Sequence, residues 1–180
     1  RRRIKSLCFR YNQTDPMNEE QRGKLICELL GGAGKTPWLE TPIHFAYGCN
    51  TTVGDHFYSN FNLTVVDDVS VTIGNCVMCA PNVTISTTGH PVHPYYRTRG
   101  AQFSLPIVIE DNVWIGANVM IMPGVTIGKN SVIGAGSVVT HDIPADVVAF
   151  GTPCRVIRPI TDADLETIRP GATINEDWNW

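Results

Sequence analysis

The second half of the sequence is dominated by a period of six residues. Aliphatic residues recur at every sixth position, and each is followed four places on by another compact residue. Neither the 3.6-residue period of a helix nor the two-residue alternation of a strand produces this pattern. It predicts a triangular parallel β-helix, in which three hexads close one coil and successive coils stack their aliphatic side chains into one core. The two series are Ile109, Ile115, Ile121, Ile127, Ile133 and Val139, and Val113, Val119, Val125, Ser131, Ser137 and Ile143.

The same phase appears earlier, at Ile73, Cys79 and Ile85, and resumes at Ile109 after an interval of four repeats. The interruption at about residues 86–106 is therefore an insertion within one continuous coil. A weaker run with a different phase lies upstream, at Tyr47, Val53, Ser59 and Val65. We expect three segments: a helical segment 1–40, the coil 41–160 with its inserted loop, and a short helix with a tail at 161–180.

Capping signals predict one helix on each side of the coil. Asp15-Pro16 is typical of a helix start, an apolar stripe from Leu25 to Leu30 follows, and Gly31-Gly32 is a stop. Near the C-terminus, Thr161 with Asp164 resembles a capping pair. That second helix is expected to run to Arg169 and to end at Pro170-Gly171.

Charge and cysteine content narrow the class of protein. A formal net charge of -3 gives no electrostatic reason to expect a nucleic acid as partner. No apolar run approaches the roughly 20 residues that span a bilayer, so we expect no membrane association and a cytoplasmic location. The six cysteines are interpreted as reduced thiols. Cys76 and Cys79 form a C-x-x-C without a second pair, which favours packing residues over a zinc site.

The inserted loop is the first place to search for function, because long loops on rigid scaffolds tend to be functional. It contains His90 and His93, which suit acid–base chemistry at neutral pH, metal ligation, or hydrogen bonding within the loop. The residues alone leave these three alternatives open. Arg155 and Arg158 follow the coil, where guanidinium groups suit a phosphate-bearing ligand but are also common on surfaces.

Several motifs closely resemble the maltose and galactoside O-acetyltransferases of bacteria, over nearly the whole chain from Leu7 to Ile168. The resemblance implies a left-handed coil, acetyl-CoA as co-substrate without a metal, and a homotrimer with active sites between neighbouring coils. The motifs are Phe57-Tyr58-Ser59-Asn60-Phe61-Asn62-Leu63-Thr64-Val65-Val66-Asp67-Asp68, Ala80-Pro81-Asn82-Val83-Thr84, Thr88-Gly89-His90-Pro91-Val92-His93, Val113-Trp114-Ile115-Gly116, Pro123-Gly124-Val125-Thr126-Ile127-Gly128 and Gly151-Thr152-Pro153-Cys154-Arg155-Val156-Ile157-Arg158.

Carried over position by position, the resemblance makes His90 the catalytic base and places acceptor contacts at Asn60 and Asp68. Two positions depart from the pattern of the family. Ala46 stands where galactoside enzymes have an acceptor-binding serine, and the acidic acceptor residue of the family falls before Arg1. The implied acetyl-CoA contacts are Ala117, Ala135, Thr140, His141, Arg155 and Arg158.

The function expected from this resemblance is acetyl transfer from acetyl-CoA to a hydroxyl of a sugar such as maltose, glucose or a galactoside. By family analogy the hydroxyl is a primary one, and it attacks directly with His90 as general base. An acetyltransferase acting on an antibiotic or other xenobiotic hydroxyl is the main alternative. A metal-dependent hydratase on the same fold and a non-catalytic binding module are the others.

Overall fold

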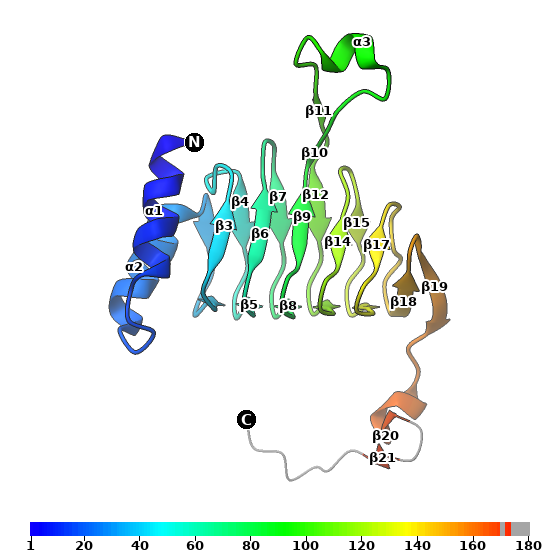
Figure 1. Cartoon of the computed structure of the whole chain (residues 1–180). Helices are drawn as coiled ribbons and strands as arrows, with labels where there is room; N and C mark the ends of the chain where they lie inside the picture. Colours follow the sequence, from blue (N-terminus) through cyan, green and yellow to red (C-terminus); the bar gives the residue numbers. More distant parts are fainter. Residues whose placement is uncertain (170–171, 174–180) are drawn as a thin grey trace.

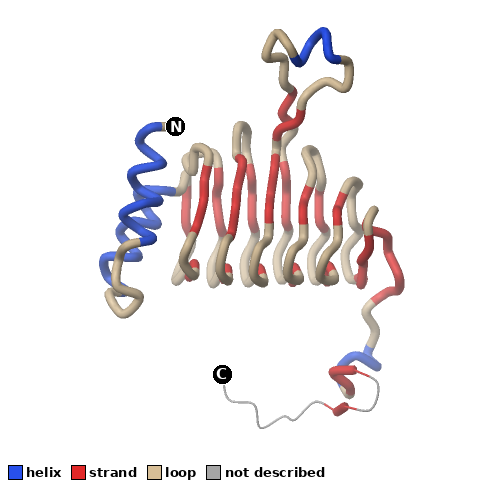
Figure 2. The backbone as a smooth tube through the Cα atoms, viewed as in Figure 1, coloured by secondary structure: helices blue, strands red, loops and turns tan. Residues whose placement is uncertain are grey.

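The computed structural model describes residues 1–169 and 172–173, and it shows a solenoid of short parallel strands. Two helices lie at the N-terminal end of the solenoid, and an arm protrudes from its middle (Figure 1). The strands form three faces of the coil (Figure 2), which we call sheets 1, 2 and 3.

Each complete coil contributes one strand to each sheet in turn, and at the C-terminal end β19 pairs antiparallel with β18. Sheet 1 consists of β1 (Gly32–Ala33), β4 (Thr51–Val53), β7 (Val71–Ile73), β12 (Ile107–Ile109) and β15 (Thr126–Ile127). Sheet 2 consists of β2 (Trp38–Leu39), β5 (Tyr58–Ser59), β8 (Met78–Cys79), β13 (Trp114–Ile115), β16 (Val132–Ile133), β18 (Val147–Gly151) and β19 (Cys154–Pro159). Sheet 3 consists of β3 (Ile43–Phe45), β6 (Leu63–Val66), β9 (Thr84–Ser86), β14 (Met120–Ile121) and β17 (Val138–Val139).

The predicted hexad residues form the core, and the fold class expected from the sequence, a left-handed parallel β-helix, is confirmed. Ile73 pairs with Ile109 and Ile109 with Ile127, so the insertion does interrupt one continuous coil. Both series of the repeat are buried, including the polar members Ser131 and Ser137, which are 0% exposed. Burial of apolar side chains, at about 25 cal/mol per Å², is the main force that holds such stacked coils together.

All departures from the six-residue period lie at one corner, where the chain leaves sheet 3 for sheet 1; we call it the 3–1 corner. Val53 pairs with Ile73, 20 residues later, whereas Ile109 pairs with Ile127, 18 residues later. Early coils therefore have two extra residues at this corner, which explains the phase difference upstream. The arm also emerges here, between β9 and β12. The 3–1 corner is thus the variable edge of a regular scaffold.

Stacked asparagine side chains support the other two corners. At the 2–3 corner, between sheets 2 and 3, Asn62 donates to Asn82 and Asn82 to Asn118, at 2.9 and 3.1 Å. At the 1–2 corner, five successive coils place a residue in the left-handed region, with φ between 54° and 62°. They are His56, Cys76, Asn112, Asn130 and Asp146.

Cys76 interrupts this second ladder. It lies between His56 and Asn112 and is exposed, whereas Asn112 and Asn130 bond onward along the ladder. The C-x-x-C pair thus splits: Cys79 packs in the core, where burial raises the pKa of its thiol to about 12, and Cys76 is a corner residue. The prediction of a packing role is correct for Cys79 and wrong for Cys76, because the hexad places only one of the two inward.

Cys76→Asn is expected to stabilise the protein by roughly 1 kcal/mol, because asparagine tolerates the left-handed region and can bond to Asn112. In a chain of this size that gain raises Tm by about 2–4 °C. Differential scanning calorimetry measures it. Cys27→Asn, at an exposed helical position, is the matched control and should give no gain. An unchanged or lower Tm for Cys76→Asn would contradict the ladder argument.

The N-terminal segment contains two helices where the capping signals predicted one. The expected helix is α2 (Glu19–Leu29), but it begins after Asn18, whose side chain accepts from the Gln21 N–H, and not at Asp15-Pro16. Asp15 instead accepts from the Met17 N–H in a local turn. The helix α1 (Arg2–Asn12) was not predicted, although its buried residues follow helical spacing: Ile4, Leu7, Cys8 and Tyr11.

A buried arginine joins both helices to the first coil. Arg22 of α2 is 2% exposed, donates to the Tyr11 hydroxyl and to the Leu39 carbonyl, and stacks 4.6 Å from the centre of the Tyr11 ring. Burial raises the pKa of Tyr11 to about 12, so its hydroxyl stays protonated and donates to Leu39. Because β1 and β2 pair with strands of the coil, the parallel sheets begin at Gly32, ahead of residue 41.

The C-terminal helix is shorter than expected. Thr161 and Asp164 do form a capping box, but it caps a 3-10 helix, η1 (Asp162–Leu165), and the chain turns into β20 (Thr167–Arg169), which pairs with β21 (Ala172–Thr173). The prediction of a helix to Arg169 is therefore wrong, and the predicted stop at Pro170-Gly171 lies outside the described residues. In the part of the chain that the structure describes, no helix is long and apolar enough to cross a membrane.

Candidate active site

His90 lies on the arm, just beyond the short antiparallel pair that attaches the arm to the coil. This pair is β10 (Thr88–Gly89) with β11 (Phe103–Ser104). The Thr88 and Ser104 hydroxyls are 2.8 Å apart across it. The imidazole is exposed, and its Nδ1 lies 2.8 Å from the Ala101 carbonyl oxygen. A carbonyl can only accept, so Nδ1 carries the proton and Nε2 keeps a free lone pair.

His93 has a different environment from His90. Its Nδ1 accepts from the Tyr95 N–H at 3.2 Å, at the start of the four-residue helix α3 (Pro94–Arg97) in the arm. Within residues 1–169 and 172–173, no three His, Cys, Asp or Glu side chains cluster closely enough to hold a metal ion. His93 thus makes a hydrogen bond within the loop, which was one of the three alternatives.

Asp68 lies at the 3–1 corner, one coil before the arm. Its side chain is 7% exposed, and its Oδ1 pairs with the Arg1 guanidinium at 2.9 Å. Its backbone N–H donates to the Thr87 hydroxyl at the root of the arm. The second carboxylate oxygen, Oδ2, is buried without a hydrogen-bond partner. A buried carboxylate oxygen without a donor is costly, which makes it a natural acceptor for a ligand hydroxyl.

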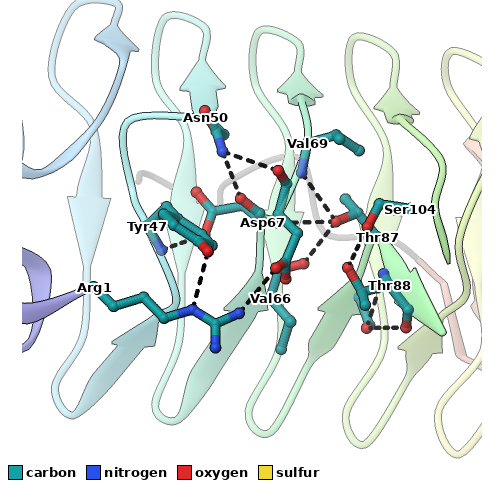
Figure 3. A network of polar contacts seen from close by, with 11 residues as sticks. Arg1, Tyr47, Asn50, Val66, Asp67, Val69, Thr87, Thr88 and Ser104 are labelled. Atoms are coloured by element: carbon teal, nitrogen blue, oxygen red, sulfur yellow. Dashed lines mark hydrogen bonds and ion pairs between the residues drawn. The ribbon is translucent and has the colours of Figure 1, made fainter. Parts of the chain in front are cut away.

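The preceding residue, Asp67, has a structural role. It is 0% exposed and accepts from the Tyr47 N–H and the Thr51 hydroxyl, at 2.8 and 3.0 Å. Asn50 donates to the Asp67 carbonyl in the same network (Figure 3). These hydrogen bonds hold the longer 3–1 corner between β3 and β4 in place. The sequence did not identify three residues that contact the candidate residues or their network. The change of repeat phase was the available signal that this region is special. The three are Tyr47, Thr87 and Ala101.

Asn60, Ala117 and Ala135 all lie at the 2–3 corner, with Asn60 two coils before Ala117 and three coils before Ala135. The strands that precede them stack in register, Ser59 on Cys79, Cys79 on Ile115 and Ile115 on Ile133. The Gly136 N–H donates to the Ala117 carbonyl, so Ala117 and Ala135 are on adjacent coils. Gly116 must lack a Cβ, since one would lie 2.6 Å from the Ala135 nitrogen. This corner presents a small-residue surface.

Thr140 and His141 lie at the 3–1 corner, two coils beyond the arm, with the Thr140 hydroxyl 2.9 Å from His141 Nδ1. His141 and Arg155 line one cavity of about 280 Å³ beside Asp142, Ile143, Cys154 and Val156. Arg158 lies farther along β19 and is paired through both terminal nitrogens with Asp164, at 2.7 and 2.8 Å. That pairing lowers the pKa of Asp164 to about 2, so a ligand would compete with a carboxylate for Arg158.

The candidate residues thus divide between two corners of one chain. Asp68, His90 and His141 follow strands of sheet 3, whereas Asn60 and Ala117 precede them. Four residues of extended β6 alone separate Asn60 from Asp68 by roughly 13 Å. A single chain therefore does not bring the two groups together.

The outer face of sheet 2 is apolar. Met78 and Trp114 are neighbours in register and are 47% and 50% exposed. The half-buried Trp38, Tyr58, Val132 and Val148 continue this column along the solenoid. Sheet 1 instead presents Thr52, Thr72 and Thr126 outward. Sheet 2 therefore has the exposed apolar surface that is typical of a protein interface.

A separate cavity of about 380 Å³ lies between α2 and the first coil, beside Arg22, Ile26 and Trp38. Its lining is largely apolar, and none of the candidate residues lines it. We therefore base the site on the arm and the corners and not on this cavity.

Comparison with known proteins agrees with this architecture. A family model described as bacterial transferase hexapeptide (six repeats) matches residues 106–141, and one described as the maltose acetyltransferase hexapeptide capping motif matches residues 1–34. The chain is 56% identical over 164 residues to the galactoside O-acetyltransferase of Escherichia coli K12, covering 91% of this chain and 81% of that protein. It is 49% identical over 172 residues to the Lactococcus lactis galactoside O-acetyltransferase, covering 95% and 83%.

Two solved structures are similar over most of their length. Galactoside acetyltransferase in complex with coenzyme A superimposes with a TM-score of 0.95 at 52% identity, covering 97% of this chain and 88% of that one. A maltose O-acetyltransferase from Clostridium difficile 630 gives 0.88 at 44% identity, covering 90% and 87%.

A hexapeptide coil that carries a histidine arm and a helical cap defines an acyltransferase of the hexapeptide-repeat class. Within that class, the chain belongs to the family of maltose and galactoside O-acetyltransferases. The family resemblance stated from the sequence motifs is confirmed.

Proposed function

We propose that the protein transfers an acetyl group from acetyl-CoA to a primary hydroxyl of a sugar such as maltose, glucose or a galactoside, with His90 as general base. The observation that carries this proposal is the contact between His90 Nδ1 and the Ala101 carbonyl, which in the neutral imidazole makes Nε2 the basic nitrogen of an exposed side chain. Two galactoside O-acetyltransferases among the relatives support the sugar acceptor. A homologous structure that contains coenzyme A supports the acetyl donor.

The proposed reaction is a direct transfer without an acetyl-enzyme. His90 Nε2 removes the hydroxyl proton while the oxygen attacks the thioester carbonyl, and the tetrahedral intermediate then expels the CoA thiolate. The imidazolium returns its proton to that thiolate, so the histidine ends the cycle neutral. Backbone N–H groups are proposed to stabilise the oxyanion.

Acetyl-CoA is proposed to follow the edge of the solenoid. His141 and Arg155 line one cavity, where the Arg155 guanidinium would attract the phosphates of CoA. Thr140 adjoins that cavity through its contact with His141. Arg158 would contribute by exchanging Asp164 for a phosphate. Ala117 and Ala135 would contribute backbone atoms, because their corner is small enough for close approach by the pantetheine chain.

The acceptor is proposed to bind at Asp68 and Asn60. The buried, unpartnered Oδ2 of Asp68 would accept a hydrogen bond from a sugar hydroxyl, and Arg1 and Thr87 hold the residue in place. Asn60 would contribute its side-chain amide from the 2–3 corner. Orientation of this kind can matter to the rate as much as the proton transfer itself.

The active site is proposed to form between copies in a homotrimer. Asn60 and Asp68 lie at opposite ends of β6, so a ligand that touches both corners must lie between two chains. The exposed pair Met78 and Trp114 gives sheet 2 the apolar surface that a second copy would cover. The arm would then reach toward the neighbouring subunit.

The protein is proposed to work in the cytoplasm. All six cysteines lie among the described residues and are free, and reducing conditions would keep them so. Burial raises the pKa of the thiol of Cys154, beside the proposed CoA cavity, which makes it less reactive toward oxidants.

An acceptor panel tests the function. With acetyl-CoA as donor, release of free thiol is measured for glucose, maltose, galactosides, amino sugars and hydroxylated antibiotics. We expect at least one sugar to give a kcat/KM in the range of about 10⁴–10⁸ M⁻¹s⁻¹ that is usual for enzymes, and to exceed every antibiotic. If an antibiotic gave a higher kcat/KM than every sugar, the acceptor would be a xenobiotic hydroxyl and not a sugar. Failure of all acceptors to release thiol would refute O-acetyl transfer to this set.

A further inference from the structure

The arm that carries His90 is attached to the coil by very few contacts. β10 and β11 share only two residue pairs, Thr88 with Ser104 and Gly89 with Phe103. Beyond this pair, the described residues of the arm, 90–102, bond mainly among themselves, as in the contact between His90 and the Ala101 carbonyl. In Figure 1 the arm accordingly projects from the solenoid as a narrow hairpin. The position of the imidazole depends on how firmly this two-residue pair is held.

The two faces of the strand pair are held in different ways. Side chains alternate across a strand, so Thr88 and Ser104 point to one face and Phe103 to the other. On the first face the two hydroxyls are 2.8 Å apart. On the second face the Phe103 ring lies directly over Gly89: a Cβ built on that glycine would be 2.6 Å from Cζ and 3.0 Å from Cε1 of the ring. Gly89 is the residue that precedes His90.

Phe103 is not a core residue. It is 47% exposed, whereas the hexad residues inside the coil are almost fully buried. Much of the free energy that a phenyl ring gains on burial is therefore forgone at this position. The ring instead makes a tight contact with Gly89, the residue directly before His90.

We infer that Phe103 is a positioning residue for His90: its ring closes over Gly89 and fixes the direction in which the arm leaves the coil. This inference rests on the proposed role of His90 as the base. Proton transfer requires Nε2 within hydrogen-bond reach of the acceptor hydroxyl. A displacement of about 1 Å can cost a hundredfold in rate, so a loosened strand pair would lower kcat while leaving CoA binding intact.

Phe103→Ala tests this in the full-length protein. We expect kcat to fall about tenfold or more, with unchanged Kd for CoA by calorimetry and unchanged Tm, because the ring is half-exposed. Phe103→Leu keeps an apolar branch above Gly89 and should lose less. Phe9→Ala removes a ring that is 68% exposed on α1, outside the arm, and it should keep the wild-type kcat.

A double-mutant cycle separates this role from a general loss of structure. Gly89→Ala alone should displace the ring and lower kcat to a similar extent, and the double variant should be no worse than either single one, because both changes break the same contact. Losses that multiply in the double variant would overturn the inference, as would a kcat for Phe103→Ala within twofold of wild type. An active His90→Ala would instead refute the proposed function itself.

Discussion

His90→Ala is expected to lower kcat by a factor of about 10² to 10⁴, which is the usual contribution of a positioned general base. The physical reason is the fixed tautomer: the Ala101 carbonyl holds the proton on Nδ1, so Nε2 is free to take a proton from the acceptor. Alanine removes that lone pair and leaves the strand pair of the arm in place. The measurement is steady-state thiol release together with the Kd for CoA, which should not change.

His93→Ala is the matched control, because it removes an imidazole three residues away on the same arm. His93 caps α3 through the Tyr95 N–H, so its loss should affect local order in the arm and not the chemistry. We expect a loss of kcat well below that of His90→Ala. Near wild-type turnover in His90→Ala, or equal losses in both variants, would show that neither imidazole is the base.

Trp114→Glu is expected to convert the proposed homotrimer to monomers and to abolish most of the activity. Trp114 is half-exposed in the centre of the outer face of sheet 2, beside Met78, and its side chain points away from the coil's own core. A carboxylate at the centre of an interface loses its water and costs several kcal/mol in each subunit contact. Sedimentation velocity reports the mass of the particle, and the thiol assay reports the activity.

Val108→Glu provides the comparison on another face. Val108 also points outward, between Thr72 and Thr126 in sheet 1, where the neighbours are polar. It should leave both mass and activity unchanged. If Trp114→Glu remained trimeric and active, sheet 2 would not be the interface. A Trp114→Glu monomer with full activity would keep the interface and refute active sites shared between chains.

The inward positions of the coil could be read from the sequence with almost no error. A hexad residue such as Ile109 or Ile121 is inward because its own strand and turn fix its direction, and burial then follows from stacking on Ile73 or Ile85. The helix at the N-terminus was harder to predict. The apolar stripe of α1 is narrow, and arginines surround it in the sequence. The helical spacing of its apolar residues is therefore clear only once the coil that α1 covers is known.

The sequence by itself therefore determined the coil and its interruption, and the resemblance of its T-G-H-P-V motif to a known family pointed to His90. These are local properties, since a period or a motif involves residues within a few positions of one another. Only the tertiary structure decided what surrounds them. It brought Arg1 to Asp68 across 67 positions, seated Phe103 over Gly89, left Asp68 Oδ2 without a partner and separated Asn60 from Asp68. Such contacts depend on coil length and register at the corners, where two added residues shift every later side chain to a new neighbour.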